Sequence, residues 1–73
     1  MSMTPQPPRT RRHKLGSGTP ADAYSIESGM VIVGVSVRSD GCWLMVPVPG
    51  GPRWGVEPRK FVRHGEGMAW LAE

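Results

Sequence analysis

The stretch that decides the fold is Asp40-Gly41-Cys42-Trp43-Leu44-Met45-Val46, followed by Gly55-Val56-Glu57-Pro58-Arg59-Lys60-Phe61-Val62. Asp-Gly is a preferred pair for a two-residue hairpin turn, because such a turn requires positive φ angles. The residues after that turn follow the two-residue period of a strand, with Leu44 and Val46 on one face. The Gly and Pro residues of the second segment mark further turns. Together the two segments predict most of a small β-barrel.

Two strands are expected on either side of this turn. Residues 30–38 place four valines on one face, which we expect to be the core face: Val31, Val33, Val35 and Val37. Residues 42–48 form the second strand, with Leu44, Val46 and Val48 on one face and Trp43, Met45 and Pro47 on the other. Because prolines lack an amide donor, this strand is expected at a sheet edge or to end near Pro47.

The rest of the chain is divided by Gly and Pro. Gly50-Gly51-Pro52 predicts a turn and Arg53 to Glu57 a short third strand. Pro58-Arg59-Lys60 predicts a single 3₁₀-like turn, after which Phe61-Val62 returns to the core as a short last strand. For residues 65–73 the sequence leaves two alternatives, one helical turn or a strand that closes the barrel.

Residues 1–22 are expected to form a disordered basic arm, and residues 23–73 the barrel. The arm has few apolar side chains to offset the entropy of ordering it, namely Met1, Met3, Leu15 and Ala21. Its four basic residues face a single acidic one, Asp22, whereas residues 23–73 hold five basic and five acidic residues. The net charge of +3 is therefore carried by the arm.

Composition excludes several classes of protein. A chain of 73 residues has room for one domain with a thin core. Since no apolar run approaches the roughly 20 residues of a membrane span, we expect a cytoplasmic protein with no membrane partner. Cys42, His13 and His64 fall short of the four ligands of a structural zinc site, so neither a metal nor a cofactor is expected. No motif supplies His64 with a nucleophile or carboxylate, which favours a non-catalytic protein.

The spacing of Trp43-Leu44-Met45-Val46, a glycine turn and Gly55-x-x-Pro58-x-x-Phe61-Val62 resembles the C-terminal half of SH3 domains, over about residues 38–63. The resemblance implies an all-β, SH3-like barrel of about five short strands. In SH3 domains the matching Trp, Pro and aromatic positions form a floor that binds polyproline-II peptides. Carried over to this chain, those positions are Trp43, Pro58 and Phe61.

Two functions follow as hypotheses. The leading one is an adaptor that binds a protein partner through an aromatic face, formed by Trp43, Trp54, Pro58 and Phe61. The alternative is a nucleic-acid-binding accessory protein, whose phosphate contacts are Arg9, Arg11, Arg12, Lys14, Arg53, Arg59, Lys60 and Arg63. A further hypothesis docks the Pro5-Gln6-Pro7-Pro8-Arg9 segment on Trp43 and Phe61 of its own or a neighbouring chain. Homo-oligomerisation is left open.

Overall fold

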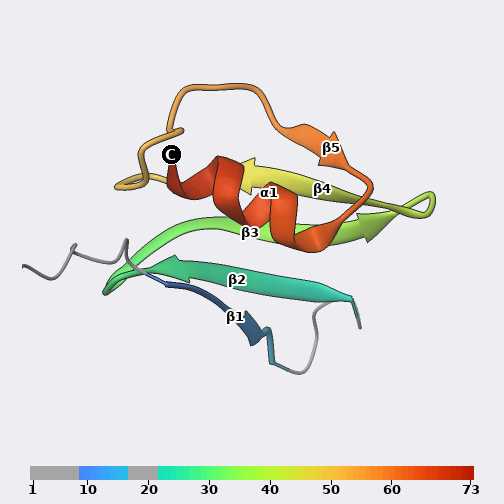
Figure 1. Ribbon diagram of the computed structural model, residues 1–73, viewed down its shortest axis with the longest axis horizontal. Coiled ribbons are helices and arrows are strands. Elements are labelled where there is room, and N and C mark those ends of the chain that lie inside the picture. Colours follow the sequence, from blue (N-terminus) through green and yellow to red (C-terminus); the bar gives the residue numbers. More distant parts are fainter. Residues whose placement is uncertain (1–8, 17–21) are drawn as a thin grey trace, which may run out of the picture.

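The structure, a computed structural model, describes residues 9–16 and 22–73 of the chain. Five antiparallel strands form one sheet in sequence order, each strand pairing with the next, and a helix follows them (Figure 1). The elements are β1 (Thr10–Lys14), β2 (Ala23–Ser28), β3 (Val31–Ser39), β4 (Cys42–Pro47), β5 (Arg59–Phe61) and α1 (His64–Ala72). The expectation of a small domain made mostly of strands is confirmed.

The Asp40-Gly41 turn joins β3 to β4 as predicted. Asp40 has a φ of 50° and Gly41 a φ of 78°, and Ser39 and Cys42 are the first cross-strand pair after the turn. Gly29, with a φ of 65°, makes the corresponding turn between β2 and β3. Both hairpins are therefore set by local turn chemistry.

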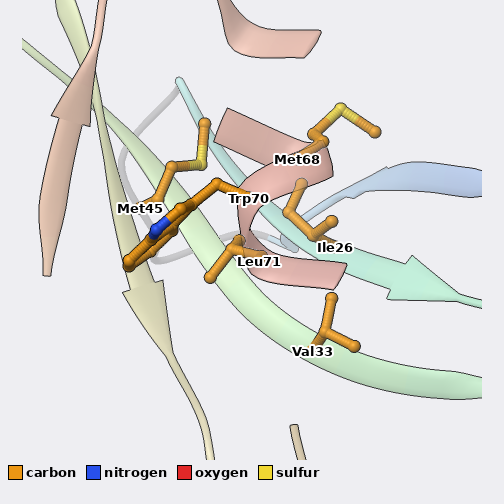
Figure 2. Close-up of a cluster of buried hydrophobic side chains, with 6 residues drawn as sticks. All are labelled: Ile26, Val33, Met45, Met68, Trp70 and Leu71. Atoms are coloured by element: carbon orange, nitrogen blue, oxygen red, sulfur yellow. The ribbon is translucent and has the colours of Figure 1, made fainter. Parts of the chain in front are cut away.

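Helix α1 packs against one face of the sheet and forms the core with it. Figure 2 shows the buried side chains between the helix and strands β2, β3 and β4, which are Ile26, Val33, Met45, Met68, Trp70 and Leu71. Ile26, Met45 and Leu71 have an exposed fraction of 0%. The core thus combines the helix-facing side of three central strands with one side of α1.

The expectation that the four valines of β3 form the core face holds only for Val33, which is buried in the core, and is wrong for Val31, Val35 and Val37. The helix-facing residues in the middle of β3 are Gly34 and Ser36, while Val35 and Val37 lie half-buried on the opposite face. A side chain at Gly34 would meet Leu71, since a Cβ built there lies 2.6 Å from both Leu71 Cδ atoms. The face that receives α1 is therefore the one with small residues, because the helix needs a close approach.

The C-terminal third also differs from expectation. Residues 53–57 form turns rather than a strand, with local bonds such as that from the Val56 amide to the Arg53 carbonyl (2.9 Å). Arg59 and Lys60, expected in a 3₁₀-like turn, belong to β5. Residues 64–72 form α1, because burial of its apolar side chains outweighs the low helix propensity of Gly65 and Gly67. No helix in the described ranges is long and apolar enough to cross a membrane.

The basic arm contains a strand. Residues 10–14, expected to be disordered, form β1 and pair with β2 from Thr10 opposite Ser28 to Lys14 opposite Tyr24. Backbone pairing at a sheet edge does not require apolar side chains, which is why composition gave no sign of this strand. Residues 1–8 and 17–21 of the expected arm lie outside the described residues.

Replacement of Gly34 by Ala should test the contact between β3 and α1. The added methyl group would meet Leu71 and also the Val46 carbonyl oxygen, 2.8 Å away. We expect a loss of about 1–3 kcal/mol in the free energy of unfolding, measured by urea denaturation. Gly65→Ala is the matched control, because no heavy atom lies within 4 Å of its Cβ position. Equal urea midpoints for Gly34→Ala and the wild type would contradict the close approach.

Candidate functional site

The four aromatic and proline residues of the predicted partner face do not lie together. Trp43 and Phe61 are cross-strand partners on β4 and β5, and both are half-buried. Helix α1 packs on both rings, with Trp70 at 5.6 Å from Phe61 and His64 at 4.3 Å from Trp43 between ring centroids. Trp54 and Pro58 instead lie in the loop between β4 and β5, where Trp54 is 61% exposed.

Three rings from separate elements meet at the N-terminal end of α1. The Tyr24 ring of β2 lies 5.9 Å from the Trp43 ring and 5.6 Å from that of His64, the first residue of α1. All three residues are half-buried. These distances fall in the range of favourable tilted ring contacts.

A buried hydroxyl fixes the His64 ring. Ser36 of β3 is completely buried, and its Oγ lies 2.7 Å from His64 Nε2. Burial lowers the pKa of His64 below its usual value, and the positive charge of Arg12 lowers this pKa further. The imidazole is therefore held neutral more strongly than in water.

Arginines cover the two ends of this ring group. The Arg12 guanidinium carbon lies 5.3 Å from the centre of the Tyr24 ring, and that of Arg38 lies 5.2 Å from the Trp43 ring. Both arginines are exposed. We call these five residues the arginine-capped ring cluster: Arg12, Tyr24, His64, Trp43 and Arg38. It places two cations and three rings on one continuous surface.

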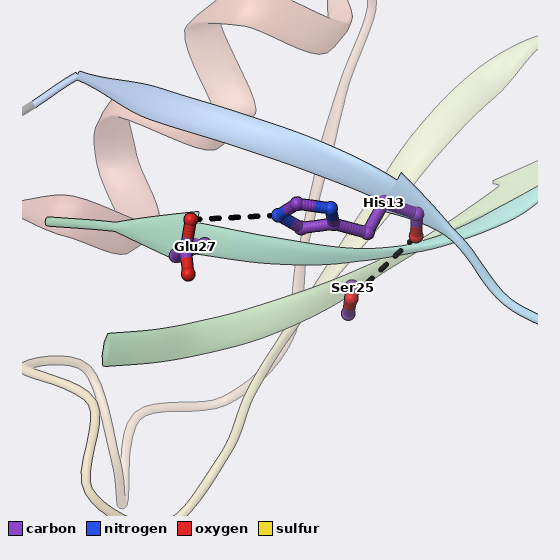
Figure 3. A network of polar contacts seen from close by, with 3 residues as sticks. All are labelled: His13, Ser25 and Glu27. Atoms are coloured by element: carbon purple, nitrogen blue, oxygen red, sulfur yellow. Dashed lines mark hydrogen bonds and ion pairs between the residues drawn. The ribbon is translucent and has the colours of Figure 1, made fainter. Parts of the chain in front are cut away.

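Strand β1 adds further positive charge beside the cluster. Arg9, Arg11 and Lys14 are exposed and have no ion-pair partner in residues 9–16 and 22–73. Glu27, the acidic residue opposite Arg11, is bound by His13, whose Nε2 lies 3.4 Å from the carboxylate (Figure 3). The Ser25 hydroxyl donates to the His13 carbonyl at 3.5 Å in the same network. The cations of β1 therefore remain available to an anion from solution.

The other predicted basic residues are placed elsewhere. Arg53 binds the C-terminal end of α1, where it donates to the Trp70 carbonyl and to Glu73, both at 2.9 Å. On β5, Arg59 covers the Phe61 ring at 5.1 Å, and Lys60 lies 4.0 Å from Asp40. The exposed Arg63 precedes α1 as its N-cap residue. The predicted basic residues thus divide between β1, the β5 region and the helix C-terminus.

Four members of this site were not predicted as functional residues from the sequence, namely Tyr24, Ser36, Arg38 and His64. They come from three separate elements and no local motif contains them. A correct register for β2, β3 and β4 would have placed Tyr24 opposite Ser36 and Arg38 opposite Trp43. The contact with His64 depends on α1, which the sequence did not establish.

The residue types that bind metal ions are not grouped in the described part of the chain. Within the described part of the chain, no three His, Cys, Asp or Glu residues are grouped to hold a metal ion. Cys42 is a half-buried free thiol.

In the comparisons with known proteins, no family model, no curated protein and no solved structure matches this chain.

The lowered pKa of His64 should make stability depend on pH. The unfolded chain binds the proton more readily than the folded chain, so the free energy of unfolding is greatest above the usual histidine pKa of about 6.5. We expect it to fall as the pH drops from about 7 to 5. Urea denaturation across this range should show a smaller fall for His64→Gln. The His13→Gln variant is the control, and equal falls in all three proteins would contradict the role of His64.

Proposed function

We propose that this chain is a non-catalytic accessory protein that binds nucleic acid along β1 and the arginine-capped ring cluster. The observation that carries the proposal is the set of exposed cations on β1 and just before it, Arg9, Arg11, Arg12 and Lys14, which have no acidic partner among residues 9–16 and 22–73. Arg12 and Lys14 lie on the face of the rings, and Arg11 lies on the other face of the strand. Arg12 belongs to both parts, since it lies on β1 and over the Tyr24 ring. Positive charge and accessible rings therefore meet on one surface.

The chemistry of β1 suits a polyphosphate backbone. Alternate residues of a strand lie roughly 6.6 Å apart on one face, so Arg12 and Lys14 present charge beside the rings. Arginine and lysine side chains that neutralise phosphates release condensed counterions, which gives affinity that falls steeply with salt. Lys60 and Arg53 lie outside the proposed interface, because each is beside an acidic residue.

Binding of a protein partner is the second candidate, and one observation favours it. Trp54 is 61% exposed and Val56 is 46% exposed in the loop that also contains Pro58. An SH3-like barrel remains the finer proposal for the fold, supported by the antiparallel strand order and the Asp40-Gly41 hairpin. If the chain is an adaptor, this loop would contact the protein partner in the cytoplasm, since α1 packs on Trp43 and Phe61.

Salt dependence of oligonucleotide binding tests the nucleic-acid proposal. We expect the full-length chain to bind a fluorescent oligonucleotide at low salt, with an anisotropy signal that is lost as salt rises. Lys14→Gln should lower the slope of log affinity against log salt by about 0.7–0.9, the value for one phosphate contact, because Lys14 lies beside Tyr24 on the face of the rings. Lys60→Gln removes the same charge from the opposite edge strand and should leave the slope unchanged.

Two outcomes would count against nucleic acid. One is the absence of binding at low salt, and the other is an equal slope for the wild type and Lys14→Gln. A salt-insensitive complex with a single protein, lost in Trp54→Ala and kept in Lys14→Gln, would instead favour the second candidate.

A further inference from the structure

We infer that the ligand of this surface is a single-stranded nucleic acid, whose bases stack on the arginine-capped ring cluster. The inference rests on the proposed function and adds the class of ligand and the residues that contact the bases. It depends on the planar groups of the cluster, on the position of Lys14 and on the solvent face of α1.

The cluster is a series of planar groups in contact. Arg12 lies over Tyr24, Tyr24 contacts both His64 and Trp43, and Arg38 lies over Trp43. The distances between neighbouring centres run from 4.3 Å for Trp43 and His64 to 5.9 Å for Tyr24 and Trp43. Single-stranded nucleic acids bind to surfaces of this kind, since unpaired bases stack on aromatic rings and guanidinium planes.

The outer planes of the cluster are open to a ligand. Arg12 and Arg38 are exposed, and the guanidinium carbon of each lies 5.2–5.3 Å from the centre of a ring. Each exposed guanidinium group is planar and cationic, so it can stack on a base of the ligand. Such a surface accepts any of the bases, because every base has a π face.

The phosphate backbone of a bound single-stranded nucleic acid has its own contact beside the rings. Lys14 is the cross-strand partner of Tyr24, so an exposed ammonium group belongs to the residue next to the cluster on the sheet. Arg12 lies two residues away on the same strand and the same face. A single strand can thus place phosphates along β1 while its bases reach the rings.

Duplex binding is disfavoured by α1. The exposed residues of this helix are Gly65, Glu66 and Ala69, none of which is basic. A helix that reads the major groove needs side chains that contact phosphates and base edges. The carboxylate on this helix would instead be repelled by the phosphates. In a duplex the base faces are also stacked on one another, so the rings of the cluster would find no free base.

The test compares a thymidine oligonucleotide, a uridine oligonucleotide and a mixed-sequence duplex of equal length with the full-length chain. We expect the single strands to bind at least about fivefold more tightly than the duplex at equal salt, which corresponds to one stacked base. In a Trp54→Phe background, the single strands should also quench tryptophan fluorescence, because Trp43 lies in the cluster. Tighter binding of either single strand than of the duplex supports the inference.

The paired variant Arg12→Lys with Arg38→Lys keeps both charges and removes both guanidinium planes. We expect it to lose about fivefold or more in affinity for single strands while its salt slope stays unchanged. Its urea midpoint shows whether the fold is kept, and the single Arg38→Lys variant serves if the pair is unstable. Tighter binding of the duplex, or unchanged single-strand affinity in both lysine variants, would overturn the inference. Failure of every oligonucleotide to bind would instead overturn the proposed function.

Discussion

The close approach of α1 to the sheet is the constraint on which the rest of the structure depends. Gly34 leaves room for Leu71, and Gly67 leaves room for the fully buried Met45. Glycine in a strand or helix is unfavourable by itself, and here that cost is offset because the missing side chains let two surfaces interlock. Because the core of this chain is small, the close packing of α1 on the sheet decides which face of the sheet is buried.

The same approach assembles the candidate site. Because α1 begins at His64, its first side chain reaches Ser36 on β3 and contacts the rings of both Tyr24 and Trp43. The hydroxyl of Ser36 is thereby satisfied in the core, where an unpaired polar group would be costly. Stability and the arrangement of the ring cluster therefore share one contact, and the arginines at its ends add charge without entering the core.

The sequence predicted what local chemistry controls and missed what the tertiary contacts decide. The Asp40-Gly41 hairpin and the two strands beside it were predicted, because turn residues and alternation are local signals. The core face of β3 was not predicted correctly, because a count of apolar residues favours the face of the four valines over the face of Gly34 and Ser36. Strand β1 was missed because its side chains are polar, and its pairing uses only the backbone. Of the site, the cations of β1 and Trp43 were predicted, whereas the residues that join them depend on strand register and on α1.

The edges of the sheet carry a consequence for the behaviour of the protein at high concentration. A sheet edge has free amide and carbonyl groups that a second molecule can extend, which is a common start of aggregation. Here β1 contains Arg11 and Arg12, and β5 at the other edge contains Arg59 and Lys60. Two copies that met edge to edge would bring adjacent like charges together, so mutual repulsion protects this small sheet from uncontrolled growth.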